Sequence, residues 1–376
     1  MVDNDDSVRA DCQDSAATET AGSEERLTTT HRIHPTDARD LSAVDTNSVE
    51  LVVTSPPYPM IEMWDALFAE LSPTVEEQLA AGDGEAAFEA MHEVLDSVWD
   101  EIERVLAPGG IACVNIGDAT RTIGGRFRVY PNHSRITEAF EGRGLDPLPD
   151  ILWHKPANSA AKFMGSGMLP PSAYVTLEHE YILVFRNGYR REFEPGVDCR
   201  YEAAYFWEER NRWFTDLWTE IRGRLQDLPE DELRNRAAAF PFEIPYRLIN
   251  MYSVYGDTVL DPFWGTGTTT IAAMAAGRNS VGYERDRSFV DHFDSRTDEI
   301  PEISRDVTAQ RIAAHRSFLS ERAQTGETPD YEANNYDFPV MTSQERDIRF
   351  YIASEVVETA QGYSLTHEPA EQVLPE

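Results

Sequence analysis

Residues 256–270 read GDTVLDPFWGTGTTT, and this stretch decides the fold. The apolar run at 258–260 predicts a short buried strand, and the glycines that follow predict a tight loop that a ligand can approach closely. Small residues over 268–276 predict a helix, and residues 279–283 predict a second strand that ends at Glu284. A strand, a glycine loop, a helix and a strand in this order form a βαβ unit of a parallel sheet.

The glycine loop predicts a nucleoside site without a phosphate cradle. A phosphate-binding P-loop requires a lysine after its glycines, and this loop has none. The dinucleotide pattern G-x-G-x-x-G is not met either, because Thr270 occupies the third glycine position. Glu284 follows the second strand, where an acid is placed to bind ribose hydroxyls. S-adenosylmethionine, a nucleoside without phosphate, fits this description.

A second stretch, LVVTSPPY at 51–58, predicts a buried strand with a stiff exit. Each proline fixes its own φ, offers no N–H and extends the residue before it. The Ser55 hydroxyl and the Pro56 carbonyl can accept two N–H bonds from an amino group on a flat ring, while Tyr58 lies against the ring face. Taken alone, the stretch is better explained as a strand that runs into a proline-rich turn.

The segments around these stretches complete a parallel sheet. Residues 31–34 predict a strand, and residues 38–41 a short helix. Asp37 lies between them, where it can face a ligand or cap the helix. A long amphipathic helix at 85–106 and a strand at 111–116 predict another crossover unit.

The charge is strongly negative: 67 acids and 33 bases give a formal net charge of −34. Only Lys155 and Lys162 are lysines, and the acids are spread along the whole chain. This balance is typical of an extremely salt-loving organism, where molar salt shortens the Debye length to about 3 Å. The alternative is a mesophilic protein with an acidic partner-binding face. Net negative charge argues against nucleic-acid binding, but that argument loses its force in strong salt.

The first 30 residues are polar and acidic, which predicts a disordered tail rather than a signal peptide. No apolar run is long enough to span a bilayer, so we expect a cytoplasmic protein with no membrane partner. The three cysteines show no metal-binding spacing, so we expect free thiols and no metal.

Two windows lack acids and are candidate nucleic-acid contacts. Residues 119–137 are rich in arginine, and residues 151–177 hold both lysines. A core strand at 151–155 and a flexible loop at 156–172 are the alternatives. Residues 189–235 interleave aromatics with arginine, which predicts either stacking on bases or a small helical core.

Three stretches together resemble the amino-group DNA methyltransferases, which modify cytosine N4 or adenine N6. Residues 54–58 are similar to the catalytic motif of that family and residues 261–269 to its cofactor loop, with Trp264 where a small residue is more usual. Residues 240–243, FPFE, resemble the segment that closes over the methionine end of the cofactor. The catalytic motif comes first by about two hundred residues, as in the permuted β-class order.

The resemblance implies an α/β fold, a Rossmann-like and mostly parallel sheet with helices on both faces. The methyltransferase domain would span residues 31–290, with a target-recognition region within about 120–235. Residues 291–376 would form an acidic helical extension, with a last helix near 343–360. The implied cofactor is S-adenosyl-L-methionine, and the implied partner is double-stranded DNA.

The candidate site residues fall into three groups. The candidate catalytic residues are Ser55, Pro56, Pro57 and Tyr58. The candidate cofactor-binding residues are Asp37, Phe242, Asp261, Phe263, Gly265, Thr266, Gly267, Thr268, Thr269 and Glu284. The candidate DNA-binding residues are Arg121, Arg126, Arg128, Lys155 and Lys162.

The predicted reaction is methyl transfer to the N4 amine of a cytosine flipped out of the duplex. Ser55 favours cytosine, because relatives that modify adenine N6 more often carry Asp or Asn before the two prolines. N6-adenine methylation remains the alternative, and an idle DNA-binding or regulatory protein is the alternative of another class. Methylation of RNA or protein is a further alternative. C5-cytosine methylation is rejected, since no cysteine follows a proline as its thiolate nucleophile would.

The resemblance also bears on biological context. It implies a short palindromic recognition sequence such as CTAG and either a cognate restriction endonuclease or an orphan enzyme. Whether the protein is a monomer or a dimer is open.

Overall fold

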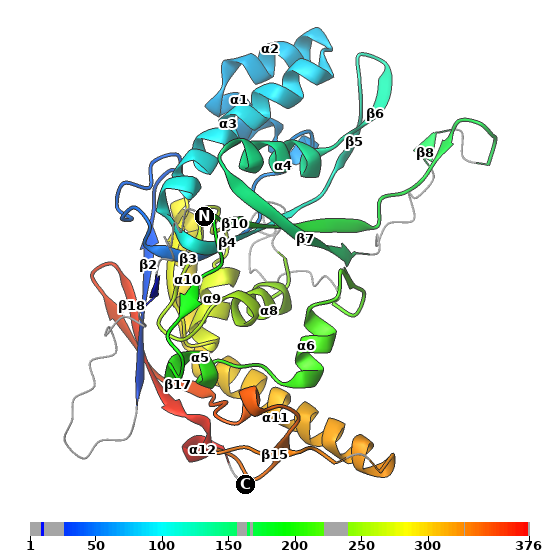
Figure 1. The fold of residues 1–376 in the computed structure, drawn as a ribbon. Coiled ribbons are helices and arrows are strands. Elements are labelled where there is room, and N and C mark those ends of the chain that lie inside the picture. The colour runs from blue at the N-terminus through cyan, green and yellow to red at the C-terminus, as the bar shows by residue number, and fades with distance from the viewer. Residues whose placement is uncertain are drawn as a thin grey trace, which may run out of the picture.

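The computed structural model describes residues 9–10, 26–155, 164–165, 168–221, 240–326 and 328–374. Its main sheet contains β2 (Leu27–His34), β3 (Val49–Thr54), β4 (Leu106–Ile116), β7 (Leu145–His154), β10 (His179–Asn187), β12 (Leu217–Trp218), β13 (Thr258–Asp261), β14 (Asn279–Tyr283), β17 (Tyr351–Thr359) and β18 (Gly362–Pro369). These ten strands lie in the order β12-β7-β10-β4-β3-β13-β14-β2-β18-β17. Figure 1 shows β18 beside β2 and β7 beside β10. Within this described sheet, only β10 and β18 run against the other strands.

The predicted βαβ unit is present. β13 and β14 pair in parallel and are joined by α9 (Thr268–Ala275). β3 pairs in parallel with β13 on one side and with β4 on the other. Parallel strands end at the same edge of a sheet, so the stretches 54–58 and 261–269 meet in space although they are far apart in the chain.

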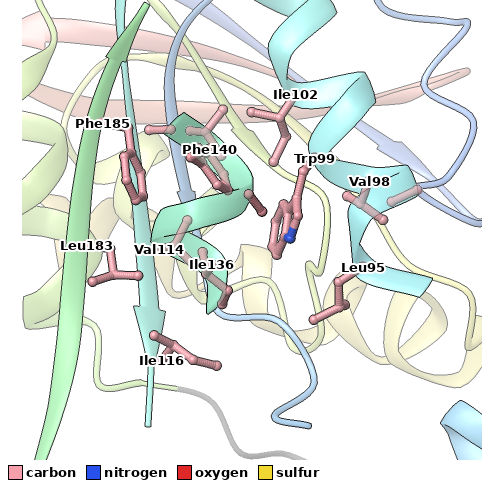
Figure 2. Close-up of a cluster of buried hydrophobic side chains, with 14 of the residues drawn as sticks. Leu95, Val98, Trp99, Ile102, Val114, Ile116, Ile136, Phe140, Leu183 and Phe185 are labelled. Atoms are coloured by element: carbon pink, nitrogen blue, oxygen red, sulfur yellow. The ribbon is translucent and has the colours of Figure 1, made fainter. Parts of the chain in front are cut away.

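Helices cover both faces of the sheet, as predicted. Side chains alternate along a strand, so odd-numbered and even-numbered residues of β4 and of β10 face opposite sides of the sheet, each covered by a different layer of helices. One layer contains α3 (Gly84–Val105) and α4 (Asn132–Gly142), and Figure 2 shows their side chains against Val114, Leu183 and Phe185. The other layer contains α8 (Glu243–Tyr252) and α9.

The remaining elements surround this core. They are β1 (Arg9–Ala10), η1 (Glu62–Trp64), α1 (Asp65–Leu71), α2 (Pro73–Ala81), β5 (Ala119–Ile123), β6 (Arg126–Tyr130), β8 (Met164–Gly165), β9 (Ala173–Tyr174), β11 (Glu192–Phe193), α5 (Asp198–Glu202), α6 (Trp207–Trp213), α10 (Arg287–Thr297), α11 (Ile300–Gln324), β15 (Tyr331–Glu332), β16 (Pro339–Val340), η2 (Ser343–Glu345) and α12 (Ala370–Val373). Among the helices in the described part of the chain, none has the length and apolar composition that a membrane span needs.

Three predictions of local structure are wrong. Residues 38–41 form turns rather than a helix, and β2 begins at Leu27, inside the expected disordered tail. The last helix expected at 343–360 is instead η2 followed by β17, which pairs with β18 and extends the main sheet beside β2. Alternate residues of β18 are buried, a period of two that only a strand produces. The extension is helical as far as Gln324, in the end of α10 and in α11, and the short strands β15 and β16 follow.

In its described part, the aromatic segment at 189–235 packs large rings into two hydrophobic clusters of the protein interior. Phe206, Trp213 and Trp218 are fully buried. The Trp218 indole N–H donates to the backbone oxygen of Trp213 at 2.9 Å, so the polar atom of this ring is satisfied inside the protein. These three rings are therefore not available to stack on bases.

The cysteines differ from one another. Cys113 lies in β4 as a buried free thiol, and burial raises its pKa. Cys199 is disulfide-bonded, so the prediction of a free thiol is wrong at that position. A buried thiol with a raised pKa is a poor nucleophile, so Cys113 cannot act as the thiolate of a C5-cytosine enzyme.

Candidate active site

A cavity of about 560 Å³ lies at the carboxyl edge of the central strands. Its volume is in the range of small-molecule sites, and its place follows the rule for open α/β sheets. Many of the predicted site residues line it: Asp37, Ser55, Pro56, Pro57, Asp261, Phe263, Gly265, Thr266, Thr268, Thr269 and Glu284.

Asp261, at the end of β13, joins the two motifs. Its carboxylate accepts hydrogen bonds from the hydroxyls of Thr54 and Thr269, each at 2.7 Å, and from the backbone N–H of Phe263 at 3.1 Å. Burial raises the pKa of Asp261 to about 6, against the opposing effect of these hydrogen bonds. One carboxylate thus fixes the end of β3, the glycine loop and the start of α9 relative to one another.

Glu284 holds the glycine loop from the other side. Its carboxylate accepts hydrogen bonds from the backbone N–H groups of Gly265 and Asp286, both at 2.8 Å. The pKa of Glu284 lies above its usual value, because burial raises it by more than the two backbone hydrogen bonds lower it. Each carboxylate oxygen retains a lone pair for a ligand hydroxyl.

Position 265 requires a glycine because of its backbone conformation and because it lines the cavity. Its φ is +53°, in the left-handed region, and a Cβ built there would meet only the Phe263 backbone oxygen, at 3.9 Å. Because the position lines the cavity, a side chain would project into the space that a ligand occupies.

Asp37 lies in the cavity wall and not at a helix N-cap. Arg39 donates to both of its carboxylate oxygens, at 3.1 and 3.0 Å, and Arg285 lies 3.4 Å away. Burial raises the pKa of Asp37, but the hydrogen bonds and charge of Arg39 and the charge of Arg285 lower it below its usual value.

Two predicted cofactor-binding residues lie outside the cavity lining. Phe242 stacks on Tyr246 of α8, with ring centroids 5.3 Å apart, and Phe240 lines the cavity in its place. Gly267 has φ +77°, and a Cβ there would lie 2.5 Å from the Phe293 ring. Gly267 is therefore needed for packing at the start of α9 rather than for ligand contact.

One wall of the cavity was not predicted. Residues of η1, α1 and α3 line it: Met63, Trp64, Ala66, Leu67, Phe68, Glu70, Leu71, Val94, Leu95 and Val98. The amphipathic pattern of 85–106 predicted a buried face but gave no sign that part of this face reaches a cavity.

Beside the cavity, Ser55 and Tyr58 belong to a hydrogen-bond network. The Ser55 hydroxyl donates to the Tyr58 hydroxyl at 3.2 Å, and Tyr58 donates to Glu180 Oε2 at 3.0 Å. Asn115 Nδ2 donates to both Tyr58 and Glu180, each at 2.8 Å. Lys155 Nζ lies 2.6 Å from Glu180 Oε1. No local sequence signal pointed to Asn115 or Glu180.

The predicted DNA-binding residues have different surroundings. Arg121 and Arg128 form ion pairs with Asp65 and Glu85, which occupy their guanidinium groups. Arg126 is exposed at the turn of the β5–β6 hairpin. Lys155 pairs with Glu180, and Lys162 lies outside the described residues. In the described part of the chain, no group of three or more His, Cys, Asp or Glu side chains is placed to hold a metal ion.

The cavity and its two motifs define an N6/N4-type DNA methylase. The model of the N6/N4 methyltransferase family, described as DNA methylases, matches residues 49–295, and the chain belongs to this family.

Individual relatives agree. The chain is 53% identical over 328 residues to the Type II methyltransferase M.MthZI of Methanothermobacter thermautotrophicus. The aligned region covers 86% of this chain and 91% of that protein. It is also 53% identical to the Type II methyltransferase M.MjaI of Methanocaldococcus jannaschii, over 70% of this chain and 89% of that protein.

A solved structure shows the same fold. It is a protein of Thermus thermophilus, provisionally assigned as a DNA modification methylase and complexed with S-adenosyl-L-methionine. The two chains are 32% identical with a TM-score of 0.57, over 73% of this chain and 95% of that chain. The predicted methyltransferase fold and the predicted cofactor, S-adenosylmethionine, are confirmed.

The residues of this cavity fit that cofactor. Gly265 leaves open space beside its backbone, and Asp37 and Glu284 present carboxylates. Phe263 and Phe240 add apolar surface for a flat ring. The cavity has the acceptors, the apolar wall and the close backbone approach that a nucleoside without phosphate requires.

Proposed function

We propose that this protein transfers a methyl group from S-adenosylmethionine to the N4 amine of cytosine in double-stranded DNA. The observation that carries this proposal is the hydrogen bond from the Ser55 hydroxyl to Tyr58. Because the single proton of that hydroxyl is donated to Tyr58, the lone pairs of Ser55 Oγ remain available at the cavity wall to accept from an amino group.

The proposed reaction depends on positioning. The N4 nitrogen is a poor nucleophile, because its lone pair is delocalised into the ring. Ser55 Oγ and the Pro56 carbonyl accept its two hydrogens and draw the nitrogen toward tetrahedral geometry, which directs the lone pair into the cavity. S-adenosylmethionine, when bound there, supplies an electrophilic methyl group. Holding the two reactants in line supplies most of the rate enhancement.

The target base must leave the duplex to reach Ser55. Tyr58 is proposed to lie against the face of the flipped base. Its ring is partly buried against the strand ends, and its hydroxyl is held by Ser55, Asn115 and Glu180. These contacts fix the ring before the base arrives, which lowers the entropic cost of binding.

We propose that Asp37, Glu284, Asp261 and the glycine loop form the cofactor half of the site. Glu284 is placed to accept from ribose hydroxyls, and Asp37 is placed to accept from another polar group of the ligand. Asp261 acts through the loop, since the two threonine hydroxyls and a backbone N–H already occupy its carboxylate.

The choice of cytosine N4 over adenine N6 rests on Ser55. A hydroxyl offers one small acceptor beside the Pro56 carbonyl, where Asp or Asn would offer a longer side chain. Nucleoside mass spectrometry tests the choice, using duplex DNA incubated with purified protein and cofactor. We expect N4-methylcytosine. N6-methyladenine alone would assign the adenine reaction, and no methylated nucleoside would favour an idle DNA-binding protein.

Two further proposals concern conditions and sequence. With a net charge of −34, the protein is proposed to be halophilic and to bind DNA in molar salt, where self-repulsion is screened. Assays should therefore compare molar KCl with dilute buffer. A short palindrome such as CTAG is the proposed recognition sequence, and a duplex in which that sequence is scrambled is the matched control. A restriction endonuclease of the same specificity is the proposed biological partner.

A further inference from the structure

Glu180 is an acid that the catalytic and cofactor motifs do not include. It lies near the start of β10, the antiparallel strand beside β4, where its neighbour Tyr181 pairs with Ile116 at the end of β4. Its side chain is only 12% exposed and accepts from three side chains, those of Tyr58, Asn115 and Lys155. A largely buried carboxylate must be paired and hydrogen-bonded, and these three side-chain donors meet that requirement.

The hydrogen bonds around Glu180 have a direction. Ser55 donates to Tyr58, and Tyr58 donates to Glu180 Oε2. The chain therefore begins at the atom proposed to contact the target amine and ends at a carboxylate, the strongest proton acceptor in it. Lys155, whose side chain is 45% exposed, contacts the other oxygen of Glu180 and connects the end of the chain to solvent.

The chemistry of amine methylation releases a proton that an acceptor must take up. Once the methyl group is attached, the exocyclic nitrogen has four bonds and a positive charge. Loss of one proton restores the lone pair and its delocalisation into the ring, so this nitrogen is strongly acidic. Ser55 is a neutral hydroxyl and cannot keep the proton.

We propose that Glu180 is the proton acceptor of the reaction, reached through Ser55 and Tyr58. The N–H bond of the methylated amine breaks, its electron pair returns to nitrogen, and the proton goes to Ser55 Oγ. The original proton of Ser55 moves to the Tyr58 oxygen, and the original proton of Tyr58 moves to Glu180 Oε2. The products are a neutral methylated base, unchanged Ser55 and Tyr58, and a protonated Glu180.

The surroundings of Tyr58 support a concerted transfer. Burial and the nearby Glu180 carboxylate raise the pKa of Tyr58, so a phenolate is disfavoured. Tyr58 gains one proton as it loses another and never carries a charge. Asn115, which donates to both oxygen atoms of this last step, holds them at hydrogen-bond distance.

The competing explanation is that Glu180 only positions Tyr58. Glu180→Gln separates the two, because a glutamine oxygen still accepts from Tyr58 and Asn115 but does not take the proton. Lys155 is exposed enough to turn away from the new amide. The inference rests on the proposed function, so wild-type protein is assayed first.

Single-turnover methyl transfer at saturating DNA and cofactor tests the relay. We expect Glu180→Gln to slow transfer about 100-fold, within the range for loss of a general base, while cofactor affinity and melting temperature stay near wild-type values. Formate should partly restore transfer in Glu180→Ala by entering the vacated space as a carboxylate. Glu103→Gln, an exposed change on α3, is the control for loss of one charge and should match wild type.

The outcomes separate the two proposals. An active wild-type protein with an equally fast Glu180→Gln, or a Glu180→Ala variant that formate does not accelerate, overturns the relay alone. A wild-type protein that transfers no methyl group overturns the proposed function and the relay with it.

Discussion

The proposed cofactor half of the cavity and the hydrogen-bond network beside it, formed by Ser55, Tyr58, Asn115 and Glu180, both contain buried carboxylates, but the donors differ. Asp261 and Glu284 accept from threonine hydroxyls and backbone N–H groups, which belong to the loop and strand ends they fix. Glu180, in contrast, accepts from the side chains of Tyr58, Asn115 and Lys155 and from no backbone N–H of the described residues. Carboxylates that hold backbone in place maintain the shape of a site, whereas one that ends a chain of hydroxyls can take part in the chemistry.

The largest effect is expected at the start of that chain. Ser55→Ala removes the hydroxyl proposed to accept from the target amine, and transfer should fall about 1000-fold, as when a preorganised hydrogen-bonding group is lost from an active site. Cofactor affinity should change little, because the Ser55 hydroxyl bonds Tyr58 and not the residues of the proposed cofactor half. Rapid-quench assays with labelled cofactor measure the rate, and calorimetry measures the affinity.

Ser354→Ala is the control, since this exposed hydroxyl on β17 bonds only the Thr366 backbone oxygen in the described part of the chain. Full activity in Ser55→Ala would refute the role given to Ser55.

Glu284→Ala should weaken cofactor affinity more than it slows methyl transfer, which is the opposite of the result expected for Ser55→Ala. The N–H groups of Gly265 and Asp286 lose their acceptor, at a cost of about 1–3 kcal/mol. Cofactor affinity should therefore weaken about 10- to 100-fold, while the rate at saturating cofactor changes much less. Titration calorimetry gives the affinity. A variant that binds cofactor normally but transfers slowly would place Glu284 in the chemistry instead.

Asp261→Asn should reveal the cost of burying a carboxylate. The pKa of Asp261 is raised to about 6, so between about pH 4 and 6 the folded state holds a proton that the unfolded state has lost. Ionisation then opposes folding, and this contribution to stability falls as pH rises through that window. The free energy of unfolding of wild type minus that of Asp261→Asn should fall by about 2–3 kcal/mol.

Urea unfolding of both proteins at several pH values measures this difference, and the effects of all other acids cancel in it. A difference that stays constant from pH 4 to 7 would contradict the raised pKa.

Sequence predicted the parts of the site that follow local rules. A glycine loop after a strand and two prolines after another each have a local signature, and parallel pairing then brings them together. The same reasoning selected Phe242 from the FPFE segment, but Phe240 lines the cavity and Phe242 does not.

Other features depend on contacts that no local pattern encodes. Glu180 lies 122 positions from Tyr58 and reaches it only because β10 inserts antiparallel between β4 and β7. β17 carries acids at positions that also suit an exposed helix, and its pairing with β18 decides its conformation. Arg121 and Arg128 lie in one acid-free window of the sequence, but the fold brings acidic partners to them from other segments of the chain.

A double-mutant cycle on Tyr58→Phe and Glu180→Gln tests most directly whether Ser55, Tyr58 and Glu180 act as one chain of proton transfer. Phenylalanine keeps the ring proposed to lie against the base and removes only the hydroxyl between Ser55 and Glu180. If the proton passes through both groups, either single change breaks the path, and the double variant should be no slower in single-turnover transfer than the slower single variant. Rate losses that multiply in the double variant would show two independent contributions and would contradict the relay.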